Sequence, residues 1–74
     1  MNTKTIARNG KPLTLQTFQK ADLLGITFWQ GRAMFRIAGD TARVDVVTTE
    51  RHGCPQSAED AVIALAIENG WGTT

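Results

Sequence analysis

The sequence of 74 residues contains few features that could cross-link its fold or attach it to a membrane. It contains one cysteine, Cys54, so no intramolecular disulfide can form. An unpaired thiol is typical of a reducing compartment, and we expect a cytoplasmic protein. The N-terminus is polar and no apolar signal-type segment follows it. The longest apolar run, residues 61–67, is far shorter than the roughly 20 residues that cross a bilayer, so we expect no membrane partner.

Side chains that could carry catalysis are also scarce. His52 is the only histidine, and it stands two positions before Cys54. Such a pair could supply a thiolate nucleophile or two metal ligands, but no third orienting residue is evident. We therefore interpret the segment as a plain loop, with a redox-sensitive or dimer-bridging thiol as the alternative. No glycine-rich phosphate loop is present. We therefore predict no catalytic residues, no metal and no cofactor, and hence a protein that is not an enzyme.

The composition, 42% hydrophobic and 20% charged, is that of one globular domain over residues 1–74. The net charge is only +1, yet the charges are segregated. Residues 1–20 carry four cations and no acid, whereas residues 52–74 carry three acids and no lysine or arginine. This asymmetry predicts a dipolar molecule that can steer a partner, although unevenly distributed solvated charge would give the same pattern.

The most informative segment is the apolar run near the C-terminus. Ser57 and Asp60 precede it as a capping-box variant, and Gly70 follows it where a left-handed residue closes a helix. Trp71 then stands where a side chain packs back on the last turn. The pattern predicts a helix that is apolar over most of its circumference, which must be sandwiched or form an interface.

Not all of this apolar surface can face one sheet. Val62, Leu65 and Ala66 share the side that we expect to cover the sheet, which leaves Ile63 and Ile67 on an adjoining side. We predict that these two isoleucines form the interface of a homodimer, unless the N-terminal segment covers them.

The rest of the chain predicts short strands. Asn9-Gly10 indicates a hairpin within residues 1–13, and Thr14 can cap a helix over residues 15–24. Alternation then predicts strands at 26–30, 33–38 and 42–49, separated by turns at 30–32 and at Gly39-Asp40. The expected fold is α+β, a two-layer sandwich with a three-stranded antiparallel meander in the order (ββ)αβββα, whose core spans residues 14–70. Its expected sheet core is Ile26, Phe28, Phe35, Ile37, Val44 and Val46.

One face of this predicted meander has the composition of a binding surface. Alternation places on it the side chains Trp29, Met34, Arg36 and Arg43. Aromatic residues, methionine and arginine are enriched at protein interfaces, and the same set suits stacking on nucleic acid bases. Alternatively, the N-terminal helix or hairpin covers this face and Trp29 belongs to the core.

The predicted order over residues 14–70 resembles that of a double-stranded RNA-binding domain. That family places lysines at the start of its last helix, where they meet phosphates. The matching positions here are Ser57-Ala58-Glu59-Asp60, whose two acids would repel a phosphate backbone, so the resemblance does not imply RNA binding.

Two functional hypotheses remain. The first is a small protein-binding module; in size it resembles the inhibitors that phages and mobile elements encode against host systems, such as anti-CRISPR proteins. The second is a nucleic-acid-binding module that uses the basic N-terminal segment together with Trp29, Arg36 and Arg43.

Overall fold

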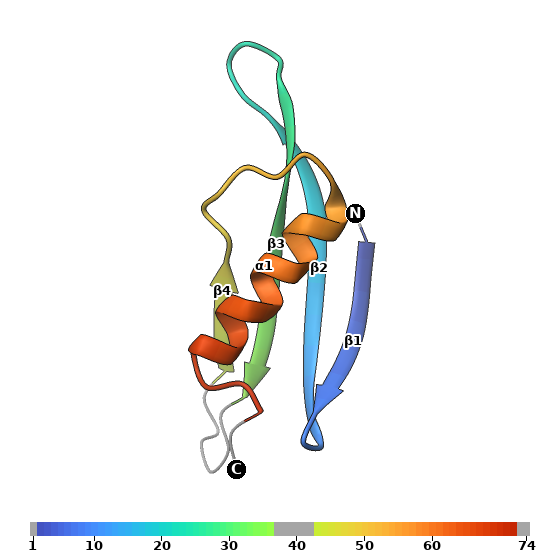
Figure 1. Cartoon of the computed structure of the whole chain (residues 1–74), viewed down its shortest axis with the longest axis vertical. Helices are drawn as coiled ribbons and strands as arrows, with labels where there is room; N and C mark the ends of the chain where they lie inside the picture. The colour runs from blue at the N-terminus through green and yellow to red at the C-terminus, as the bar shows by residue number, and fades with distance from the viewer. Residues whose placement is uncertain (1, 37–42, 73–74) are drawn as a thin grey trace.

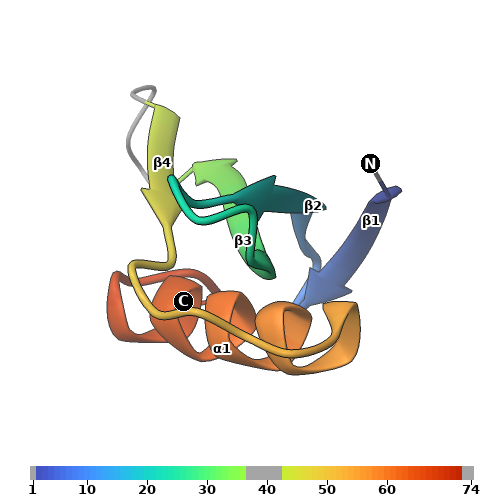
Figure 2. The ribbon, with the colours of Figure 1, turned by 90° about the horizontal axis from the view of Figure 1, so that it is seen from above.

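The computed structural model describes residues 2–36 and 43–72 and shows a four-stranded antiparallel sheet with one helix across one face (Figures 1 and 2). The elements are β1 (Asn2–Arg8), β2 (Lys11–Ala21), β3 (Thr27–Arg36), β4 (Arg43–Val47) and α1 (Pro55–Glu68). The strands are neighbours in chain order, β1-β2-β3-β4. The predicted α+β class is confirmed, whereas the predicted order is wrong, because the chain runs ββββα. No helix in the described ranges is long and apolar enough to span a membrane.

The predicted N-terminal hairpin is present. Asn9 and Gly10 both have positive φ angles, 51° and 75°, as a two-residue type I′ turn requires. Arg8 and Lys11 are paired at its base, and the ladder extends from there to Asn2 and Thr17.

The helix predicted over residues 15–24 is wrong, because most of this segment is strand β2. The spacing of Leu15, Phe18 and Ala21 imitates a helical period, but Leu13, Leu15 and Thr17 alternate just as well, and these three are the buried side chains. β2 pairs with β1 on one side and with β3 on the other. Hydrogen bonding to a strand on each side therefore stabilises this segment as a strand, although its sequence also fits a helical period. The resemblance to a double-stranded RNA-binding domain ends here, since its first helix has no counterpart.

The turn predicted at residues 30–32 is also wrong, because β3 continues through Gly31. A Cβ atom on Gly31 would lie 2.8 Å from the Ala58 carbonyl oxygen and 2.9 Å from Cβ and Cγ1 of Val62. Glycine in a strand interior marks such a close approach. Gly31 is therefore where α1 lies directly on the sheet. The predicted turn at Gly39-Asp40 lies outside the described residues.

The C-terminal helix is confirmed, with a different start. It begins at Pro55 after the N-cap residue Cys54, so Ser57 is not the cap. Pro55 accounts for this, because proline has a preset φ and needs no N–H partner at the first helical position. The predicted ending is correct: Gly70 has φ 102°, and the backbone N–H of Trp71 donates to the Ala66 carbonyl at 2.9 Å, as in a Schellman motif.

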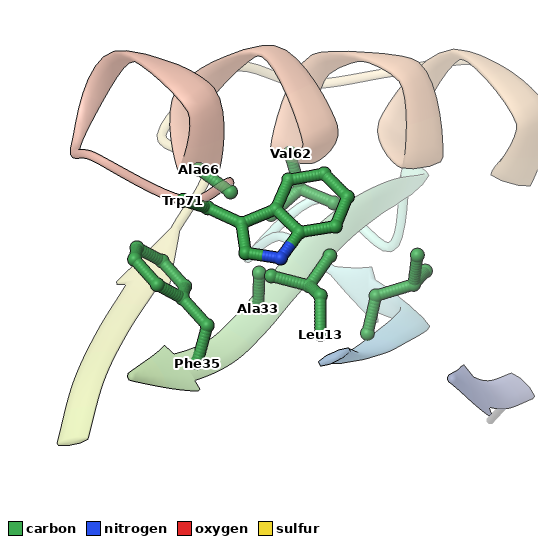
Figure 3. Close-up of a cluster of buried hydrophobic side chains, with 7 residues drawn as sticks. Leu13, Ala33, Phe35, Val62, Ala66 and Trp71 are labelled. Carbon is green, nitrogen blue, oxygen red and sulfur yellow. The ribbon is translucent and has the colours of Figure 1, made fainter. Parts of the chain in front are cut away.

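The core lies between α1 and the central strands (Figure 3). The buried cluster consists of Leu13, Leu15, Ala33, Phe35, Val62, Ala66 and Trp71. Among the predicted core residues Phe35 is buried, and Val44 and Val46 pack partly against the cluster. Ile26 was misassigned, since it is 58% exposed at the end of a hairpin. Ile37 lies outside the described residues.

Trp71 also connects the end of the chain to its first turn. Its indole Nε1 donates to the Lys11 carbonyl at 3.1 Å, and Arg8 Nη1 donates to the carbonyl of Trp71 at 3.3 Å. Asn9 Nδ2 donates to the Gly72 carbonyl at 2.8 Å. We call these contacts the terminal latch.

Candidate partner-binding surface

The sheet has one covered face and one face that no described element covers (Figure 2). The covered face carries Leu13, Leu15, Ala33 and Phe35, so strand alternation places the residues between them on the other side. We call this second side the open face. Its members on the three C-terminal strands are Thr14, Gln16, Phe18, Lys20, Phe28, Gln30, Arg32, Met34, Arg36, Arg43, Asp45 and Val47.

Three of the four predicted partner-binding residues lie together on the open face. Arg36 is directly opposite Arg43 across β3 and β4, and Met34 is opposite Asp45 in the same ladder. Both arginines are exposed and Met34 is half-buried. Like charges directly opposite each other destabilise an isolated sheet. The pair is therefore a local excess of positive charge at the end of the sheet.

A third arginine on this face is neutralised within the chain. Arg32 Nε lies 2.9 Å and 3.1 Å from the two carboxylate oxygens of Asp45, and its Nη2 also contacts Oδ2. These hydrogen bonds lower the pKa of Asp45 and raise that of Arg32. Arg36 and Arg43 form no ion pair with any carboxylate of residues 2–36 and 43–72.

Trp29, the fourth predicted residue, is on the other side. The prediction assumed a turn at residues 30–32, but the continuous strand gives Trp29 the parity of Gly31 and Ala33, which face the helix. Phe28 takes its place on the open face. The backbone of Trp29 pairs with His52, with N···O distances of 2.8 Å and 3.1 Å.

The β2–β3 hairpin projects beyond the helix along the 44 Å axis of the molecule (Figure 1). Three large apolar side chains stand on its turn: Leu23 (105% exposed), Leu24 (84%) and Ile26 (58%). We call these three residues the apolar tip. Sequence reasoning missed it, because Leu24 was placed in a helix and Ile26 in the core.

The turn beneath the apolar tip is held in one shape. The carboxylate of Asp22 accepts the backbone N–H groups of Leu24 at 2.8 Å and Ile26 at 3.0 Å, and Arg51 Nη1 lies 2.8 Å from its second oxygen. The Arg51 contact and these N–H groups lower the pKa of Asp22. The Arg51 guanidinium also lies 4.5 Å from the ring centre of Phe28. Hydrogen bonds therefore hold the turn in one conformation, in which the side chains of the apolar tip are exposed.

The two predicted interface isoleucines differ in their surroundings. Ile63 packs partly against the core cluster, together with Ile6 of β1. Lys4 of β1 pairs with Glu59, one turn before Ile63, at 2.5 Å. The N-terminal hairpin therefore reaches α1 through this ion pair, and the homodimer interface at Ile63 and Ile67 stays a prediction. Ile67 remains 40% exposed.

His52 and Cys54 do not form a metal cluster with other ligands among the described residues. His52 is half-buried and its Nε2 has no hydrogen-bond partner in the described chain. Cys54 is exposed, with its sulfur 3.4 Å from Ser57 Oγ. That hydroxyl, followed by the Ser57 and Gln56 backbone amides, lowers the pKa of the thiol.

A cleft of about 410 Å³ lies beside the start of α1, on the covered side of the sheet. Its lining includes Lys4, Leu15, Thr17, Cys54, Pro55 and Glu59. The lining therefore combines apolar residues with the Lys4–Glu59 ion pair.

Comparison of the chain with protein-family models, with curated proteins and with solved structures finds no match.

Proposed function

We propose that this chain is a small, non-catalytic protein-binding module whose partner contacts the open face. The observation that carries the proposal is the placement of Arg36 opposite Arg43, beside Met34, on a face that no described element covers. Arginine and methionine are enriched at interfaces, and arginines are frequent among the residues that dominate binding energy. A partner with carboxylates opposite the arginine pair would relieve their repulsion, so we propose an acidic partner surface.

The setting that fits this module is the cytoplasm, which the single free thiol Cys54 supports. The chain resembles anti-CRISPR proteins in size. This resemblance supports a narrower proposal, in which a phage or mobile element encodes the chain and its binding through the open face blocks a host complex.

The test is capture of a partner from a bacterial lysate on the immobilised chain, with and without nuclease, followed by affinity measurement on the purified partner. Arg36→Glu with Arg43→Glu should weaken binding by at least about 30-fold, the equivalent of roughly 2 kcal/mol. Ala64→Glu adds negative charge on the exposed part of α1 and is the control, which should bind normally. Unchanged affinity of a folded double variant would exclude the open face.

A second candidate function, nucleic acid binding, has one observation in its favour. Phe18 and Phe28 share the open face with Lys20 and the arginine pair, and aromatic rings beside cations suit single strands. The predicted basic N-terminal segment is less suited to this role, because Lys4 pairs with Glu59 and Arg8 donates to Trp71. Loss of the captured partner on nuclease treatment, with salt-dependent binding of a labelled single strand, would favour this function over the first.

A further inference from the structure

β1 (Asn2–Arg8) is an edge strand, because the described sheet has the order β1-β2-β3-β4. Figure 2 shows it at the outer margin of the sheet, with no described element beyond it. An edge strand carries a row of backbone N–H and C=O groups with which a further strand can pair. We propose that the β1 strand of a second copy occupies this edge, in an antiparallel dimer with twofold symmetry. The edge is distinct from the open face and from the side of α1 that carries Ile63 and Ile67, so the inference does not depend on the proposed function.

The backbone groups that face this edge follow from the register of the ladders beside it. Asp22 N–H donates to the Ile26 carbonyl at 3.0 Å, in the same register as the β2–β3 ladder. Hydrogen-bonded positions alternate along an antiparallel ladder, so the even-numbered residues of β2 bond to β3 and the odd-numbered residues bond to β1. Leu15 is paired with Lys4, so the even-numbered residues of β1 bond back to β2. The N–H and C=O groups that point to the free edge are therefore those of Thr3, Thr5 and Ala7.

One register joins all of these groups to a second copy. A twofold axis at Thr5 places Thr5 opposite Thr5 of the second copy, and Thr3 opposite Ala7. Each of these pairs then exchanges two backbone hydrogen bonds. A shift by two residues leaves either Thr3 or Ala7 without an opposite residue in the strand. A shift by one residue brings an outward-facing residue opposite an inward-facing one, so the ladder cannot form. The full-length pairing is therefore also the pairing that satisfies the whole edge.

The side chains are compatible with this register. Lys4 lies opposite Ile6 of the second copy and Arg8 lies opposite Asn2, so no two cations are directly opposite each other. On the axis Thr5 lies opposite Thr5, and cross-strand pairs of threonine stabilise sheets. This threonine is exposed in one chain, so it is available to a second copy.

The other edge strand, β4, does not offer the same fit. Thr48 N–H donates to the Gly31 carbonyl at 2.9 Å, so the outward-facing residues of β4 are Arg43, Asp45 and Val47. Full-length pairing of two β4 strands would place Asp45 opposite Asp45, and like charges directly opposite each other destabilise a sheet. Pairing of β1 with β4 would leave a free edge at each end and give an open polymer. The β1 edge is therefore the one that can close a dimer.

The resulting dimer is one continuous sheet with both helices on the same side. The twofold axis is perpendicular to the sheet, so the two covered faces lie together and both open faces point the other way. Lys4 pairs with Glu59 at 2.5 Å, which places the start of α1 near the N-terminal part of β1. Because the paired strands are antiparallel, the two helix starts lie toward opposite ends of the interface and do not meet.

Two measurements test for this dimer. Light scattering across a concentration series should give twice the monomer mass at high concentration. Amide hydrogen exchange followed by NMR should show that Thr3, Thr5 and Ala7 become protected only as the dimer forms, whereas Lys4 and Ile6 are protected at every concentration. A monomer at millimolar concentration, or free exchange of the three outward-facing amides in the dimer, would overturn the proposal.

Variants of Thr5 test the surface. Thr5→Pro removes an N–H group from the free edge and leaves the β1–β2 ladder intact, at a kind of position where proline is accepted. It should keep its circular dichroism spectrum and raise the dimer dissociation constant by at least about 10-fold. Thr5→Glu is a second variant, which places like charges opposite each other on the axis. Val47→Glu is the matched control on β4 and Ile67→Asp the control on α1; both should leave the dissociation constant unchanged. A dimer weakened by either control, or by neither Thr5 variant, would assign the interface to another surface.

Cross-linking tests the register. In a Cys54→Ser background, Thr5→Cys places two thiols opposite each other on the axis, where Cα atoms about 5.5 Å apart permit a disulfide. Oxidation with diamide should therefore give a covalent dimer. Thr3→Cys is the matched control on the same strand and side, because its two copies are roughly 14 Å apart in this register and should not cross-link. Equal cross-linking of the two variants would refute the register and with it the proposed dimer.

Discussion

Gly31→Ala should destabilise the domain although alanine is normally the better residue in a strand. The added Cβ would meet the Ala58 carbonyl oxygen at 2.8 Å and two Val62 carbons at 2.9 Å. The Val62 side chain is fully buried and the carbonyl belongs to a helix, so relief requires α1 to shift away from the sheet. Overpacking of this kind costs about 1–3 kcal/mol, and the gain from replacing glycine in a strand offsets roughly 0.5–1 kcal/mol. The expected net loss is about 0–2.5 kcal/mol, with its centre near 1 kcal/mol.

The assay is thermal and urea unfolding monitored by circular dichroism. For a domain of this size, each kcal/mol lowers the melting temperature by about 4–8 °C. Gly53→Ala is the matched control, because a Cβ there has nothing within 4 Å. It should leave stability unchanged or raise it slightly, since alanine restricts the unfolded chain. If Gly31→Ala were as stable as Gly53→Ala, the close approach of helix and sheet would not be the reason for this glycine.

Three further outcomes are expected. Cys54→Ser should retain the fold and partner binding, because the thiol is exposed and serine keeps a hydrogen-bonding group beside the Ser57 hydroxyl; a large loss of either, in unfolding or binding assays, would give the thiol a role. Trp71→Phe should lower the free energy of unfolding by about 1–3 kcal/mol, since it leaves a gap in the core and removes the hydrogen bond to the Lys11 carbonyl. An unchanged free energy of unfolding, measured by urea titration, would contradict this. Because the pKa of Asp22 in the fold is lowered from 3.8, its support of the turn is present above that pH and is lost as pH falls through the lower folded pKa. The amide NMR signals of Leu24 and Ile26 should therefore titrate below pH 3.8, and a higher midpoint would exclude this linkage.

The structures that local sequence signals specify without tertiary contacts were predicted correctly. Asn9-Gly10 specifies its turn through two positive φ angles, and Gly70 with Trp71 specifies the end of the helix. The shared side of Met34, Arg36 and Arg43 followed from alternation alone, which holds wherever both strands are correctly identified. Their binding role stays a prediction.

The wrong predictions concern segments whose secondary structure is determined by tertiary contacts. A glycine that accommodates a helix has the same sequence signature as a glycine in a turn, so Gly31 was read as a chain reversal and Trp29 was assigned to the wrong side. Residues 13–18 satisfy both a helical and a strand period, and only their pairing with β1 and β3 separates the two. The apolar tip could be predicted from Leu23-Leu24-Gly25-Ile26 only once the hairpin around it was known.

The terminal latch has a consequence for how the chain folds as it leaves the ribosome. Synthesis is vectorial, so the β1–β2 hairpin emerges long before Trp71 and Gly72, whose contacts with Arg8, Asn9 and Lys11 span some sixty residues. Until then Leu13 and Leu15 lack the helix and indole that bury them. Contacts this distant in sequence are slow to form. The nascent meander is therefore expected to expose its apolar face during translation, which is when a chaperone would most readily engage it.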